Sequence, residues 1–351
     1  MNRILAAFAA AGAALVLAAT GSAAADNAYT VHPLVSNQPG VAPVTDPHLV
    51  NAWGLTASAT SPFWVADNGA DVSTLYSGTG AIVPIVVPTG EAPTGTVFNV
   101  TSGFPVNATS GPARFIFDTE GGLITAWTLI AGVPPSHPAT VEVTQPGAVF
   151  KGLAIASTAS GPRLYAADFA HQQVDVYDGS WNLISVPGMF TDPSIPSNYA
   201  PFGIQTIGSR VFVTYAQKES PDATDETAGQ GLGFVDVYDT DGNLLARVAQ
   251  HGQLNAPWGL ARAPADFGRF SNDLLVGNFG DGQINAFEEL PTGQFVHRGE
   301  LRTSDGKSLT IDGLWALRFG SGITTAPSNT LFFTAGPNDE ADGLFGSITA
   351  G

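Results

Sequence analysis

The stretch 255–290, NAPWGLARAPADFGRFSNDLLVGNFGDGQINAFEEL, contains the repeating unit from which the fold of this chain can be predicted. It has three short runs of mostly alternating apolar residues, WGLARA, LLVGNF and QINAFEE, separated by turns rich in Gly, Asp, Asn and Pro. Such runs are typical of β-strands, and the pair Asp281-Gly282 between the last two indicates a hairpin. We therefore interpret the stretch as one small antiparallel sheet.

The same unit recurs six times along the chain. The first strands read NAWGLTA, TGTVFNV, FKGLAIA, APFGIQT, APWGLAR and IDGLWAL. The second strands read FWVADN, RFIFDT, RLYAAD, RVFVTY, LLVGNF and LFFTAG, and the third strands read STLYSG, LITAWT, QVDVYD, FVDVYD, QINAFE and GLFGSI. Equivalent first strands are 41 to 57 residues apart, which is the spacing of propeller blades. We predict an all-β fold, a six-bladed β-propeller.

The predicted propeller forms a single domain, residues 29–351, and is closed by its N-terminal strand. Fourth strands are recognisable in five of the units, but the last unit, 311–351, ends after three. The segment YTVHPLVS at 29–36 alternates like a strand and belongs to no unit of its own. We expect it to pair with the last unit, which removes two exposed sheet edges.

Residues 1–25 have the features of a signal peptide. Arg3 is followed by an apolar run at 4–19 and by three alanines at 23–25 that suit cleavage. We therefore expect export to the periplasm or the extracellular space. No later run is long enough to span a bilayer, and the chain has no cysteine with which to form disulfides.

The formal net charge of −17 bears on possible partners. So acidic a chain repels nucleic acid and anionic membrane surfaces, whose binders need basic patches. We expect neither partner, and we expect a monomer. An acidic segment at 217–231 is interpreted as a solvated loop, with a cation-binding loop as the alternative.

Several strings resemble those of an uncharacterised family of secreted proteins, mostly bacterial. They are VNAWGL, FWVADNG, LYAADF, LLVGNFGDGQINAF, IDGLWALRFG and, most specifically, LFFTAGPNDEADGLFGSI. The resemblance covers nearly all of the chain after residue 25. It implies a six-bladed propeller similar in pattern to NHL-repeat proteins, and it implies export, but no activity.

The repeats place polar residues from several blades at one mouth of the central channel. The loops that enter the first strands and the loops that join second to third strands share that face. Predicted ligand-binding residues there are Asn51, Asn68, Asn255, Asp312, Trp258 and Phe279. Predicted metal ligands are Asp67, Asp168, Asn278 and Asp339, because Ca²⁺ takes six to eight oxygen ligands. The alternative for each Asp and Asn is capping of its own turn.

Three functions remain open from the sequence, and no catalytic residue is assigned. The first is an exported binding protein whose mouth engages a small polar ligand or glycan, with Ca²⁺. The second is a metal-dependent lactone or ester hydrolase like the gluconolactonases, in which a divalent cation would polarise the carbonyl and a neighbouring carboxylate such as Asp67 would be a candidate base. The third is a scaffold for protein partners.

Overall fold

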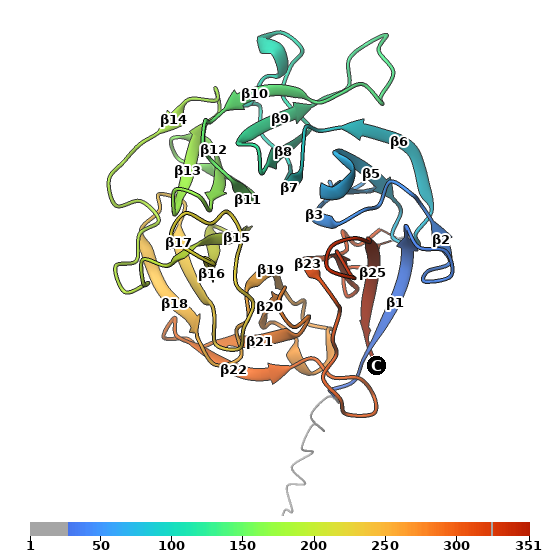
Figure 1. Ribbon diagram of the computed structural model, residues 1–351, viewed down its shortest axis with the longest axis vertical. Coiled ribbons are helices and arrows are strands. Elements are labelled where there is room, and N and C mark those ends of the chain that lie inside the picture. The colour runs from blue at the N-terminus through green and yellow to red at the C-terminus, as the bar shows by residue number, and fades with distance from the viewer. Residues whose placement is uncertain (1–26, 324–325) are drawn as a thin grey trace, which may run out of the picture.

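The computed structural model describes residues 27–323 and 326–351, and these form six mainly antiparallel sheets around a central axis (Figure 1). The first sheet contains β3 (Ala52–Thr56), β4 (Phe63–Asp67), β5 (Val72–Tyr76) and β6 (Ile82–Pro88). The second contains β7 (Pro93–Phe98), β8 (Phe115–Thr119), β9 (Leu123–Trp127) and β10 (Thr140–Thr144). The third contains β11 (Phe150–Thr158), β12 (Gly161–Asp168), β13 (Gln173–Asp178) and β14 (Leu183–Ile184). The fourth contains β15 (Tyr199–Ile207), β16 (Arg210–Gln217), β17 (Phe234–Asp239) and β18 (Leu244–Gln250). The fifth contains β19 (Pro257–Arg262), β20 (Leu274–Asn278), β21 (Ile284–Glu289) and β22 (Phe295–Glu300). The prediction of a six-bladed β-propeller is confirmed.

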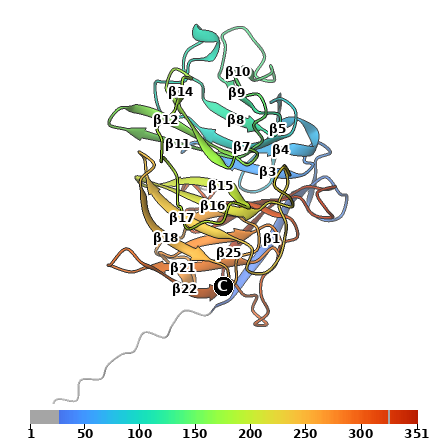
Figure 2. The same ribbon diagram turned by 60° about the vertical axis from the view of Figure 1, so that its left-hand side comes forward.

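The sixth sheet closes the ring. It contains β23 (Leu314–Phe319), β24 (Leu331–Ala335) and β25 (Leu344–Ala350), followed in space by β1 (Tyr29–Ser36) and β2 (Val44–Thr45). β1 pairs antiparallel with β25, and the two lie side by side in both views (Figures 1 and 2). The predicted closure by the N-terminal strand is therefore confirmed, while the short parallel strand β2 was not predicted.

Short 3₁₀ turns interrupt the loops at Asn68–Ala70, Val106–Ala108 and Gly268–Phe270. No helix within the described residues is long and apolar enough to cross a membrane. The predicted signal peptide, 1–25, lies outside the described residues.

Glycine in the first strands allows the blades to approach one another at the axis. A Cβ atom on Gly203 of β15 would lie 2.1 Å from the carbonyl oxygen of Trp258 in β19. A Cβ atom on Gly259 of β19 would lie 2.5 Å from the carbonyl oxygen of Trp315 in β23. Such distances are shorter than any van der Waals contact, so the narrow ring of inner strands requires glycine at these positions.

Between the blades the core is largely aromatic and aliphatic. Trp64 of β4 stacks on Phe115 of β8 with 4.0 Å between ring centroids, which joins the first two blades. Phe63 and Phe332, 4.5 Å apart, join the first blade to the last. These contacts bury the apolar faces that the alternating strands present, and they hold the sheets as one ring.

Candidate functional site

Two sets of loops meet at one end of the channel, as the repeats predicted. Within a blade, the loop that enters the first strand hydrogen-bonds to the loop that joins the second and third strands. The Asn68 amide donates to the Asn51 carbonyl at 2.9 Å, and the Phe279 amide donates to the Ala256 carbonyl at 3.0 Å. We call this end of the channel, where the inner strands begin, the loop mouth.

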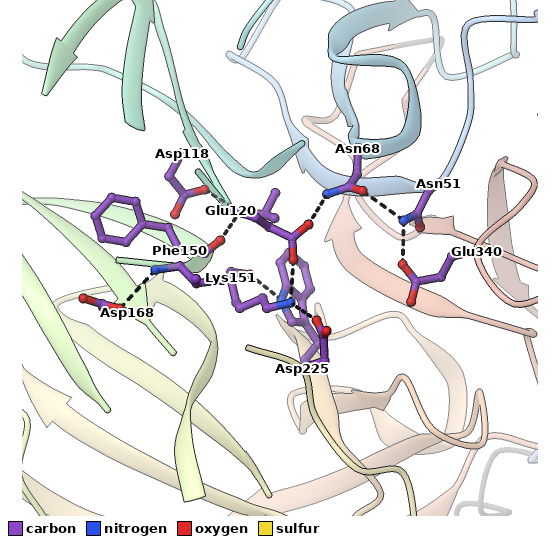
Figure 3. A network of polar contacts seen from close by, with 12 residues as sticks. Asn51, Asn68, Asp118, Glu120, Phe150, Lys151, Asp168, Asp225 and Glu340 are labelled. Carbon is purple, nitrogen blue, oxygen red and sulfur yellow. Dashed lines mark hydrogen bonds and ion pairs between the residues drawn. The ribbon is translucent and has the colours of Figure 1, made fainter. Parts of the chain in front are cut away.

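A buried lysine lies at the centre of the loop mouth. Lys151, the second residue of β11, is 1% exposed, and its Nζ donates to Glu120 Oε1 at 2.5 Å and to Asp225 Oδ1 at 3.0 Å (Figure 3). Glu120 follows β8, and Asp225 lies in the loop between β16 and β17. The ammonium group therefore connects three blades.

Two asparagines extend this network to the first and last blades. Asn51 donates from Nδ2 to Asn68 Oδ1 at 3.1 Å and to Glu340 Oε2 at 2.6 Å. Asn68 in turn donates to Glu120 Oε2 at 3.2 Å (Figure 3). Asn51 has a φ of 46°, a left-handed conformation that Asn adopts more readily than most residues. Side chains from five of the six blades thus form one polar network.

The charges in the network shift one another's proton affinities. Burial alone would lower the pKa of the Lys151 ammonium, but Glu120, Glu226 and Asp225 reverse that effect and hold the pKa above its ordinary value. Burial raises the pKa of Glu226 to about 7, although Lys151 opposes the shift. Burial also raises the pKa of Glu340, against the hydrogen bond from Asn51. The loop mouth therefore holds a protonated lysine beside two glutamates, Glu226 and Glu340, whose pKa values burial raises.

Aromatic rings form the floor beneath the lysine. The Lys151 Nζ lies 5.3 Å from the Trp53 ring centroid, and Trp53 stacks on Trp315 at 3.5 Å. Phe169 lies 5.9 Å from the Lys151 ammonium and 5.8 Å from that of Lys218, a distance at which a cation is attracted to a ring. Trp53, Trp315 and Phe169 belong to one buried apolar cluster that packs against the lysine.

Four of the six predicted ligand-binding residues belong to this network or its floor. Asn51 and Asn68 are members of the polar network, as described above. Trp258 donates from Nε1 to the Lys151 carbonyl at 2.7 Å, and Phe279 stacks on Trp315 at 4.2 Å; both are partly exposed.

The other two predicted ligand-binding residues hold loops in place. Asn255 is 7% exposed, and its Oδ1 accepts the Gly229 amide at 2.6 Å, which fixes the acidic loop of the fourth blade. Asp312 is exposed and accepts the Asn338 amide at 2.9 Å.

The four predicted metal ligands are not brought together. Asp67 accepts the Thr74 amide at 2.9 Å, and Asp168 Oδ2 meets His171 Nδ1 at 2.5 Å. Asn278 donates to the Gln253 carbonyl at 2.8 Å, whereas Asp339 is exposed. Across residues 27–323 and 326–351, no three His, Cys, Asp or Glu side chains form a group that could hold a metal ion. This donor set does not fit Ca²⁺, because Asp67, Asp168 and Asn278 make contacts near their own turns.

Sequence reasoning missed Lys151 and Glu120, and it placed Asp225 and Glu226 in a segment interpreted as a solvated loop. A signal for Lys151 was present in the repeats. It precedes Gly152, and at the equivalent place other blades have Trp53, Phe202 and Trp258. A charged residue in a column of buried aromatic residues needs buried partners, so the column itself pointed to a polar site.

The arrangement of six blades around a channel with a polar mouth defines a six-bladed β-propeller. No protein-family model matches the chain. The chain is 33% identical over 341 residues to the uncharacterised protein R648 of Acanthamoeba polyphaga mimivirus, covering 91% of this chain and 80% of that protein. It is 32% identical over 339 residues to the uncharacterised protein L690 of the same virus, covering 91% and 85%. The chain belongs to the family of these uncharacterised proteins.

These relatives are viral, whereas the motifs resembled those of a mostly bacterial family. The relatives therefore do not support the bacterial part of the prediction.

Among solved structures, a streptogramin B lyase aligns with a TM-score of 0.52 at 10% identity, over 92% of this chain and 98% of that one. Virginiamycin B lyase from Staphylococcus aureus aligns with a TM-score of 0.51 at 13% identity, over 92% and 99%. At such low identity the likeness concerns the fold alone.

Proposed function

We propose that this protein is a binding protein whose loop mouth engages a small polar ligand or glycan. The observation that carries the proposal is the network of Lys151, Glu120, Asn51, Asn68 and Glu340, in which side chains from separate blades converge at one end of the channel. A buried polar network is costly unless its members are satisfied, and a few convergent polar groups are a feature of small-molecule sites.

The balance of charge favours a ligand that donates hydrogen bonds. Carboxylates from Glu120, Asp225, Glu226 and Glu340 surround the site, against two ammonium groups from Lys151 and Lys218. Carboxylate oxygens accept hydrogen bonds from hydroxyl or amino groups. The partly exposed rings of Trp258 and Phe279 offer apolar surface for the face of a sugar ring.

Lys151 also changes the role that we expected for Ca²⁺. Its ammonium group already supplies positive charge between Glu120 and Asp225, so these carboxylates need no metal ion to balance them. We therefore propose ligand binding without an obligatory cation. The Ca²⁺ requirement predicted from the sequence is the alternative, and metal analysis of the purified protein tests it.

Titration calorimetry with a panel of neutral oligosaccharides, polyols and short polyamines tests the proposal. We expect at least one class to bind, and we expect Lys151→Met and Glu120→Gln to weaken it by about tenfold or more, because each removes a charged hydrogen-bonding group. Glu288→Gln on β21, the third strand of the fifth blade, is the matched control and should leave affinity unchanged. If no class binds, or if Glu120→Gln behaves like the control, the loop mouth is not the binding site.

A second candidate, a lactone or ester hydrolase, is favoured by one observation. Glu226 has a pKa raised to about 7 by burial, and it lies near the Lys151 ammonium, which suits a general acid or base. Lactone and aryl-ester assays, with and without a chelator, separate the two candidates. Turnover that Glu226→Gln abolishes supports the hydrolase; binding without turnover supports the binding protein.

We also propose, from residues 1–25 alone, that the protein is exported. N-terminal sequencing of protein recovered from outside the cytoplasm tests this. A mature chain that begins near Asp26 supports export, and an intact Met1 in all fractions contradicts it.

A further inference from the structure

A second opening lies at the other end of the inner strands. A cavity of about 560 Å³ is bounded by residues at or beyond the ends of β3, β7, β15 and β23, together with the middle of β11. Its apolar wall includes Leu55, Phe98, Val100 and Ile155. We call this cavity the far pocket. Its volume is in the range of pockets that hold small molecules.

The far pocket is separate from the loop mouth. Between the two ends the channel narrows to a cavity of about 20 Å³, bounded by inner-strand residues such as Gly54, Gly95 and Leu153. That space is comparable to a single water molecule. A ligand in the far pocket would therefore make no contact with Lys151 or its partners.

One charged side chain lines the far pocket, and it has no counter-ion. Arg318 of β23 donates from Nη2 to the Ala57 carbonyl at 2.8 Å. Among residues 27–323 and 326–351, no carboxylate lies within ion-pair distance of it, whereas Arg210 and Arg247 each pair with an acidic side chain. Burial lowers the pKa of the Arg318 guanidinium, with no neighbouring charge to compensate. Arg318 is therefore a partly buried cation at the pocket wall that an anionic ligand could neutralise.

A hydroxyl group beside the pocket also lacks a partner. Thr206, near the end of β15, lines the far pocket, and its Oγ1 is buried without a hydrogen bond in the described structure. Protein atoms cover this oxygen, so the Thr206 hydroxyl does not face the cavity and is not counted as a ligand contact. The neighbouring Gln205 adds an amide group to the same wall.

We propose that the far pocket binds a small molecule with one carboxylate on an apolar body. The Arg318 guanidinium receives the carboxylate, Gln205 binds a polar atom beside it, and Leu55, Phe98 and Ile155 contact the apolar part. A guanidinium matches a carboxylate in geometry and charge, which makes this class a better fit than a neutral or cationic ligand.

Calorimetric titration of the full chain with octanoate, and in parallel with octan-1-ol, tests the proposal. We expect wild-type protein to bind octanoate about tenfold or more tightly than the alcohol, because only the carboxylate makes a charge-assisted hydrogen bond. Arg318→Gln should abolish that preference. The matched control is Arg114→Gln, an exposed arginine before β8 that does not line the pocket, and it should leave both affinities unchanged.

A second variant tests the location without altering Arg318. Val100 is 76% exposed at the pocket rim, so Val100→Trp should fold and should obstruct entry of both ligands. Three results would overturn the proposal: no binding of octanoate at millimolar concentration, equal binding of octanoate and octan-1-ol, or octanoate binding that Arg318→Gln and Val100→Trp leave intact. Because Glu120→Gln affects only the loop mouth, it should not change octanoate binding, and this separates the far pocket from the proposed function.

Discussion

Buried carboxyl groups link the stability of this propeller to pH. Asp118 is fully buried, and its Oδ1 accepts Thr94 Oγ1 at 2.9 Å and the Gly95 amide at 2.6 Å. Burial nevertheless raises its pKa to about 7. Asp175 and Asp236 have pKa values raised to about 6, also by burial. The folded state therefore binds protons that the unfolded state has released in the range between the ordinary Asp value and about pH 7.

We accordingly predict that the free energy of unfolding falls as pH rises from about 5 to about 8. The stabilising effect of a raised carboxyl pKa is fully present below the unfolded value and is lost as pH rises to the folded value. Asp118 alone should contribute a loss of about 2 kcal/mol over this range. Urea unfolding at both pH values measures the change.

Asp118→Asn is the informative variant, because asparagine keeps the Oδ1 acceptor and removes the titrating group. It should flatten the pH dependence, whereas the exposed Asp222→Asn should not. A free energy of unfolding that is constant or rising from about pH 5 to 8 would contradict the assignment.

Single residues also mark the limit of what the sequence predicts about the site. Asn51 and Asn68 were predicted at the loop mouth because the repeat places them on turns of one face, and the structure includes both in the network. Asp67 and Asp168 occupy equivalent turns, yet they accept hydrogen bonds from nearby residues in their own blade. The turn position could be predicted from the repeat, but the direction of each side chain depends on contacts outside it.

At the level of the strand, glycine decides how closely the blades approach. We predict that Gly203→Ala lowers the free energy of unfolding by about 3 kcal/mol or more, because its Cβ would lie 2.1 Å from the Trp258 carbonyl oxygen. Backbone atoms of β19 would have to move. Chemical denaturation measures the loss.

The matched control is Gly121→Ala, in an exposed turn where the nearest atom would be 3.6 Å away. It should change stability by less than about 1 kcal/mol. Equal effects of the two substitutions would show that close approach of the inner strands does not explain the glycines.

Loops were less predictable than strands. The acidic segment 217–231 was correctly placed between the second and third strands of its blade, here β16 and β17. Its course over the loop mouth depends on Asn255, which binds the Gly229 amide, and on Lys151, which binds Asp225. Both partners are more than 25 residues away in sequence, so local pattern could not indicate them.

For the whole molecule, the closing strand should determine whether the ring is stable. Tyr29 of β1 is 1% exposed, lies 5.1 Å from the Phe267 ring, and donates from its hydroxyl to the Phe267 carbonyl at 3.0 Å. We predict that Tyr29→Ala lowers the free energy of unfolding by about 3–5 kcal/mol, as measured by urea unfolding.

The neighbouring Thr30→Ala is the control, because Thr30 is exposed in the same strand. It should change the free energy of unfolding by no more than about 0.5 kcal/mol. A Tyr29→Ala protein as stable as wild type would mean that β1 contributes little to closure.

The whole ring was the most predictable level, because the strand count in the repeats left the last blade one strand short. The missing fourth strand indicated that residues 29–36 pair with the last blade, and β1 pairs with β25 in the structure. No comparable count exists for the polar network, in which Lys151 has no counterpart in the other blades. The strand repeats therefore predict the architecture, whereas Lys151 of the candidate site lies where one repeat differs from the others.

The pairing of β1 with β25 also has a consequence for biosynthesis. β1 precedes all the other described strands in the chain, yet it finds its partner only after Leu344–Ala350 has been synthesised. Until then, each newly made blade has an exposed, unpaired surface to which a chaperone or a strand of another protein can bind. Assembly should therefore end in one slow step, the docking of the earliest segment onto the latest, and the nascent chain should be most prone to aggregation just before it.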